Sequence, residues 1–380
     1  MADSPTLALP QFKGRPGWEF TDISGLDLAA YDRALPVEQA PDRPLFALDS
    51  DVQLPDGVVV CALDDAPAEL RDRHLGSLVS AQDDAFVALN EAGERSGVFV
   101  YVPAGVAVTA PIALSAVQDR TGTLVNRRAL IVLEAGAEAE VWEQFLSGDA
   151  DVDGVFNVVT ELIVGDNARL RYVCGQDLSE RSWIFGAQRA AVGRDGRLDW
   201  VALGFGSARG HVRMETRLVG DGADARVTGA YATHGRQHID FDTTQEHAAP
   251  NTTSDLAFRG VLTGRSSAVW KGNIIVDPGA QKTDAFQESR NLLLSKRAHA
   301  DAIPGLEIQA NDVRCTHAAA VAQVDPEQLF YLRSHGLPEP EAKRLVIEGF
   351  LSALVERFEA GPVREQLADV LERRLALILG

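Results

Sequence analysis

The chain has 380 residues, of which 46% are hydrophobic and 24% are charged, and its formal net charge at pH 7 is −19. This length allows one large domain or two to three ordinary ones, and the composition is that of a globular protein. The strong negative charge argues against nucleic acid and anionic membrane surfaces as partners. No window approaches the length of an uninterrupted apolar membrane span, so none is predicted.

The first segment, 1–45, is irregular and rich in proline, which indicates an N-terminal arm. It has no basic segment followed by an apolar one, so no secretory signal is predicted. The three cysteines, Cys61, Cys174 and Cys315, are far apart and do not resemble a disulfide framework. We therefore expect the reducing cytoplasm as the compartment.

The next segment mixes a short strand at 58–63 with a helix near 70–89. Together with the arm it forms the first predicted unit, 1–97, an N-terminal arm with a small α/β region.

From 98 to 324 the sequence consists of short alternating apolar runs separated by glycine, asparagine and aspartate turns, a pattern that predicts strands. The turns between Gly136 and Gly222 recur at intervals of roughly 30 residues, which is typical of stacked β units. No long helical pattern interrupts the run, which argues against a βαβ fold. A β-sandwich, a barrel and a β-helix all remain, because the spacing alone does not distinguish them.

The period changes at 325, where a helical region of about 55 residues begins. Asp325 and Pro326 are a typical helix start, and Gly336 ends this first short helix. Two further helices are predicted at 340–358 and 363–379. A unit of this size has a marginal core on its own, so we expect the region 325–380 to pack on the β body or on a partner.

Cys315 and His317 are two residues apart in an apolar, strand-like run. Side chains at this spacing lie on the same side of a strand. A thiol and an imidazole placed in this way can share a metal, or one can tune the other. They can also simply be a buried thiol and a hydrogen-bonded core histidine, which the spacing alone favours.

His238, Asp240 and Asp242 form a second polar set on one strand face. They could bind a divalent metal, or act as acid and base in a β-helix enzyme that cleaves carbohydrate. A solvated strand face needs no ligand at all. The sequence has no recognisable nucleophile elbow, phosphate-binding loop or closed zinc motif.

An ordered set of motifs occupies the C-terminal half of the chain. Its members are N-L-L-L-S at 291–295, P-G-L-E-I at 304–308, D-V-R-C-T-H at 312–317, D-P-E-Q-L-F-Y-L at 325–332, and Gly336. This set resembles the C-terminal signature of the SufB/SufD family of iron–sulfur cluster assembly, and its SufD branch most closely. The chain also resembles this family at positions upstream of these motifs and near its start. They are His247, Pro250, Ser254, Lys271 and Gln287, and Trp18 and Thr21.

The resemblance implies a mainly β protein, with a right-handed parallel β-helix core at 98–324 and a C-terminal helical domain. It also implies a non-enzymatic scaffold subunit that pairs with a SufB-like paralogue and binds a SufC-like ABC-type ATPase. The ATPase would bind the C-terminal helices, where Phe330, Tyr331, Phe350 and Leu354 are the candidate contacts. The alternative is a purely structural homodimer paired through open strand edges, and an isolated chain can also form such a pair.

In SufB, a cysteine that matters for cluster assembly follows the leucine run, and Ala298 occupies that place here. By resemblance, His317 and Cys315 would lie at the interface with the SufB-like subunit, where a nascent cluster forms. Iron–sulfur clusters usually need four protein ligands. We therefore expect no cofactor on the chain alone, and a transient cluster in a site shared within the complex.

Overall fold

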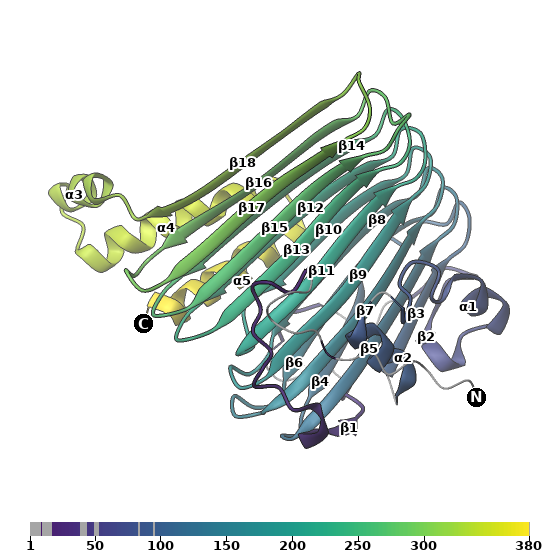
Figure 1. Ribbon diagram of the computed structural model, residues 1–380, viewed down its shortest axis with the longest axis horizontal. Coiled ribbons are helices and arrows are strands. Elements are labelled where there is room, and N and C mark those ends of the chain that lie inside the picture. The colour runs from purple at the N-terminus through teal and green to yellow at the C-terminus, as the bar shows by residue number, and fades with distance from the viewer. Residues whose placement is uncertain are drawn as a thin grey trace.

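The computed structural model describes Leu9 and residues 17–38, 44–48, 53–82, 84–93 and 96–379. Its body consists of two facing sheets, which we name sheet A and sheet B (Figure 1). From β4 onward, successive strands alternate between the two sheets, and the strands within each sheet are parallel. This is a parallel β-helix with two strands per turn, so the fold implied by the resemblance is confirmed.

Sheet A contains ten strands of the described chain and sheet B contains eight. The strands of sheet A, in spatial order, are β17 (His299–Ile308), β15 (Ser267–Val276), β13 (His238–His247), β11 (Arg209–Leu218), β9 (Trp183–Val192), β7 (Gly154–Val164), β5 (Thr123–Leu133), β3 (Ser96–Val102) and β2 (Val59–Ala62), with β1 (Asp32–Ala34) beside β5. Those of sheet B are β18 (Arg314–Gln323), β16 (Asp284–Leu293), β14 (Thr253–Leu262), β12 (Asp224–Thr233), β10 (Arg197–Gly204), β8 (Arg169–Asp177), β6 (Glu138–Ser147) and β4 (Ile112–Gln118).

The turn residues found in the sequence explain the regularity of the β-helix. Gly136, Asn167, Asp195 and Gly222 all have φ between 55° and 72°, in the left-handed region. Glycine, asparagine and aspartate adopt this conformation more easily than other residues. Their recurrence in the sequence therefore marks successive turns, and corresponding positions such as His238 and Ser267 are 29 residues apart.

The interior between the sheets is mostly apolar, with one buried ion pair near its N-terminal end. Arg127 Nε lies 3.0 Å from Glu143 Oε1, and the Tyr172 hydroxyl donates to Glu143 Oε2 at 2.7 Å. Arg127 also donates to Ser96 and Glu38. Both charged side chains of the pair are buried away from water, so each charge is stabilised mainly by the other.

The N-terminal region contains the 3-10 turns η1 (Leu28–Ala30) and η2 (Leu63–Asp65) and the helices α1 (Ala68–His74) and α2 (Ala85–Ala92). The prediction of a single helix near 70–89 is therefore wrong. Between α1 and α2, the backbone N–H groups of Gly76, Leu78 and Val79 donate to the carboxylate of Glu161 on β7. This contact holds the segment as a loop, with Gly76 at φ 77°.

The three predicted C-terminal helices are present as α3 (Pro326–Ser334), α4 (Glu339–Val355) and α5 (Pro362–Leu379). Asp325 caps α3 by accepting from the Glu327 N–H, as the sequence predicts. Helices α4 and α5 cover the outer face of sheet B, where Ile347 and Leu371 share a buried cluster with Val201 (Figure 1). Within the part of the chain described here, no helix is both long and apolar enough to cross a membrane.

His247 makes the stability of the fold depend on pH. It is fully buried, its ring nitrogens contact the hydroxyls of Thr252 and Ser254, and burial lowers its pKa to about 4. The unfolded chain therefore binds the additional proton between pH 6.5 and 4, so the stability is fully present above pH 6.5 and falls with acidification. We expect a loss of about 3 kcal/mol over this range from His247 alone.

Urea unfolding at pH 7 and pH 4.5 measures this effect. The pH-dependent loss should shrink in His247→Asn and persist in His335→Asn, which changes an exposed histidine. An equal loss in His247→Asn and the unmodified chain would contradict the assignment.

Candidate functional site: the open end of the β-helix

The two ends of the β-helix differ. At the N-terminal end, β2 pairs along the edge of β3, and Val37 forms a bridge with Val117 of β4. At the C-terminal end, β17 and β18 are the last strands of sheets A and B, and each pairs with a single neighbour among the described residues. Figure 1 shows both strands beside each other at this end. Their outer edges offer backbone hydrogen-bonding groups to another chain.

The same two strands expose large apolar side chains. Ile303, Leu306 and Ile308 on β17 and Val321 on β18 are all at least 36% exposed. Natural proteins usually protect the edge strands of a sheet from pairing with other chains, by charged side chains or by a covering segment. The edges of β17 and β18 instead combine free backbone groups with exposed apolar side chains. The open end is therefore a strong candidate for pairing with another β protein.

Cys315 and His317 lie on β18 and point toward the interior, as their register shows. Cys315 is opposite Ala285, and His317 is opposite Gln287, both of which are buried. His317 is exposed because it lies on the last strand of sheet B in the described part of the chain, whereas Cys315 is half-buried against the core. Burial, with a smaller contribution from Asp284, raises the pKa of the Cys315 thiol.

The chain offers few metal ligands around this pair. Residues 298, 300 and 302 on and before β17 are alanines, and Ala298 is buried. In the described ranges, no group of three or more His, Cys, Asp and Glu side chains is placed to hold a metal ion. Within the described residues, the chain therefore supplies this pair with no third metal ligand.

A groove of about 1160 Å³ adjoins the open end. Its walls are α3, α4 and the last residues of β16 and β18, including Leu292, Ala322 and Phe350. On α3, Phe330 is 75% exposed and Tyr331 is 63% exposed. This helix contacts α4 but contains no buried residue. Figure 1 shows it projecting from the body.

The four side chains predicted to contact an ATPase are therefore not equivalent. Phe330, Tyr331 and Phe350 line the groove, and the Arg259 guanidinium lies 5.0 Å from the centre of the Phe350 ring. Leu354 is 3% exposed and packs in the cluster between α4, α5 and sheet B. Leu354 can support the groove only by holding α4 in place.

The second polar set lies beneath the N-terminal segment. The Thr21 hydroxyl donates to Asp240 at 2.7 Å, His211 Nδ1 lies 3.0 Å from the same carboxylate oxygen, and Asp240 is 3% exposed. Burial opposes ionisation of Asp240, but His211 and Thr21 outweigh it, so the pKa of this carboxyl is lowered. Asp242 is also mostly buried, beside Lys271. An open acid–base groove, which the carbohydrate-enzyme hypothesis requires, is not present at these residues.

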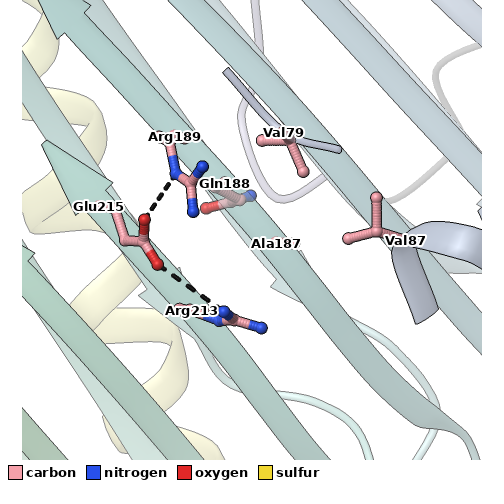
Figure 2. A pocket seen from close by; sticks show the side chains of 7 residues that line it. All are labelled: Val79, Val87, Ala187, Gln188, Arg189, Arg213 and Glu215. Carbon is pink, nitrogen blue, oxygen red and sulfur yellow. Dashed lines mark hydrogen bonds and ion pairs between the residues drawn. The ribbon is translucent and has the colours of Figure 1, made fainter. Parts of the chain in front are cut away.

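A pocket on sheet A is explained by docking of the N-terminal region (Figure 2). Val79 and Val87 approach the strand face beside Arg189, Arg213 and Glu215. Both arginines lie close to Glu215, and Arg213 also pairs with Asp84 at 3.0 Å. The charges of the pocket are thus satisfied within the chain.

Comparison with known proteins agrees with this architecture. The model of the SUF system FeS cluster assembly SufBD core domain matches residues 116–350, and that of the SufBD protein N-terminal region matches 45–114. The chain belongs to the SufBD family. Its open end and its groove lie within or beside the matched core.

The chain is similar to several curated proteins. It is 36% identical to the iron-sulfur cluster assembly protein SufD of Bacillus subtilis, over 78% of this chain and 68% of that protein. It is 31% identical to the SufBD family protein Rv1462 of Mycobacterium tuberculosis, over 74% and 72% of the two chains. It is 30% identical to the chloroplastic protein ABCI7 of Arabidopsis thaliana, over 82% and 68%.

Proposed function

We propose that this chain is a non-enzymatic scaffold subunit of a Suf-type iron–sulfur assembly complex, which pairs with a SufB-like paralogue through β17 and β18. The observation that supports this proposal most directly is the open end of the β-helix, with unpaired strand edges and exposed apolar side chains. A second β-helix of the same family has the complementary shape, because its own terminal strands can continue both sheets.

The proposed pairing gives His317 a role in a shared site. The imidazole points toward the interior end, so a docked partner would enclose it. One imidazole and one thiol are too few to hold a cluster, and the remaining ligands would come from the partner. Cys315 is the weaker candidate, because it is half-buried against the core, whereas His317 is exposed.

The proposed ATPase contact is the groove beside α3. Exposed aromatic residues at an apolar groove are typical anchors of protein interfaces. Phe330 and Tyr331 would insert into a SufC-like ABC-type ATPase, and Phe350 would form the floor of the contact. An ATPase bound in this groove would lie beside β18, the strand that contains His317.

The first test is affinity purification of the tagged chain from its native host. Recovery of a SufB-like chain and an ABC-type ATPase supports the proposal, and recovery of neither contradicts it. Sizing of the purified chain at several concentrations separates a homodimer from the complex, because an isolated open edge can also pair with its own copy.

Within the complex, His317→Ala should lower cluster formation at least several-fold while leaving assembly intact, because a ligand is lost from an exposed position. Iron and sulfide content after reconstitution provides the measurement. His299→Ala is the matched control, since His299 is also exposed on the terminal turn and its ring contacts Asp301 at 3.1 Å. Equal cluster yield in both variants would remove His317 from the site.

A further inference from the structure

Gln287 on β16 connects the two sheets at the terminal turn. It is fully buried, and its Nε2 donates to the carbonyl oxygen of Gly272 at 3.2 Å and to that of Gly305 at 3.1 Å. Gly272 is on β15 and Gly305 is on β17. A side chain of sheet B is therefore bonded across the interior to the backbone of two strands of sheet A.

Gln287 lies next to both terminal strands, β17 and β18. Gln287 is the register neighbour of His317 on β18, and it bonds directly to Gly305 on β17. The bond from Gln287 to Gly305 thus joins β17 to sheet B, in addition to the ladder that joins β17 to β15.

An amide is unusual at this position in the interior. On preceding turns the equivalent residues of sheet B are Trp200, Val227 and Leu256, and an apolar side chain would bury without cost. Gln287 instead has an Oε1 with no hydrogen-bond partner within the described ranges, which is itself destabilising. Its two donated bonds fix the position of β16 relative to β15 and β17.

Gly272 provides the space that this crossing needs. A Cβ at Gly272 would overlap the Trp270 ring and lie 2.7 Å from Gln287 Oε1. Only glycine allows the amide to lie against β15 in this way. The contact thus depends on two positions, Gly272 and Gln287, so a substitution at either one should disrupt it.

We propose that Gln287 is a positioning residue for the open end, which holds β17 and β18 at the separation that a two-stranded partner must match. This inference rests on the proposed pairing with a SufB-like paralogue. The register also places Gln287 beside His317. In this proposal, both the separation of β17 from β18 and the position of His317 therefore depend on Gln287.

The test compares Gln287→Met with Gln245→Met in the full chain. Methionine fills a similar volume and removes the amide. Gln245 is a matched control, since it is also a buried interior glutamine whose Oε1 has no partner among the described residues, but it lies on β13. Hydrogen exchange of the peptides covering 299–308 and 314–323 should be about tenfold faster in Gln287→Met alone, and affinity for the SufB-like chain about tenfold weaker.

Gly272→Ala should reproduce both changes, because it displaces the amide without removing it. Unchanged exchange at β17 and β18 in Gln287→Met, or wild-type affinity despite faster exchange, would overturn the positioning role. If the unmodified chain binds no SufB-like partner, the proposed function fails as well. If the unmodified chain and Gln287→Met bind equally, only the positioning role fails.

Discussion

Replacing Phe330 and Tyr331 together with alanine is expected to abolish measurable binding of a SufC-like ATPase. The two rings are 75% and 63% exposed, and both line the groove beside α3. Aromatic anchors of this kind cost roughly 2 kcal/mol or more each when truncated, so the pair should weaken binding by about 1,000-fold. Titration calorimetry with the purified ATPase measures the change.

The fold should not change in this variant, because no residue of α3 is buried. Leu377→Ala is a suitable control, since Leu377 is 66% exposed on α5 but does not line the groove. An affinity equal to that of the control would place the ATPase contact elsewhere on the chain.

Arg127→Met is expected to cause the largest loss of stability among the substitutions considered, about 3–5 kcal/mol in the free energy of unfolding. The substitution leaves the Glu143 carboxylate fully buried with the Tyr172 hydroxyl but without its cation. Urea denaturation gives the value. The double variant Arg127→Met with Glu143→Leu should recover most of the loss, because it removes the unpaired charge.

Arg169→Met provides the comparison for this experiment. Arg169 pairs with Glu138 at 3.4 Å, and both side chains are about half exposed or more. Such a pair contributes no more than about 1 kcal/mol. A loss in Arg127→Met as small as in Arg169→Met would show that the buried ion pair does not support the N-terminal end of the core.

The strands and terminal helices could be predicted from local sequence alone. Turn residues such as Gly136 and Asn167 adopt left-handed φ values, so their recurrence identifies the repeat directly. Alternation between those turns then predicts the strands. The choice of a β-helix over a sandwich or barrel came from the family resemblance, because strand spacing does not specify which strands become neighbours.

Contacts between distant residues explain the parts that local patterns miss. The segment between α1 and α2 is a loop because its backbone binds Glu161, 85 residues from Gly76 in sequence. Asp240 is covered by Thr21, which is 219 residues away. Neither pairing has a local signal, so a single helix and an open polar face were reasonable but incorrect expectations.

The candidate site was predictable in part. The period of two places Cys315 and His317 on one side of a strand, and the register confirms that both face the interior. They lie at an open end because β18 is the last strand of sheet B. No local sequence pattern predicts which strand is the last. Leu354 and Phe350 share one helical stripe, but only the packed helix shows that Leu354 faces the core and Phe350 the groove.

The most direct test of the pairing surface is hydrogen exchange at β17 and β18, compared between the monomeric chain and its purified complex with the SufB-like subunit. The open edges predict that the amides of 299–308 and 314–323 become strongly protected in the complex, while those of β9, which pairs with a strand on each side, change little. A stable complex in which exchange at β17 and β18 stays unchanged would contradict the proposal that this end is where the subunits pair.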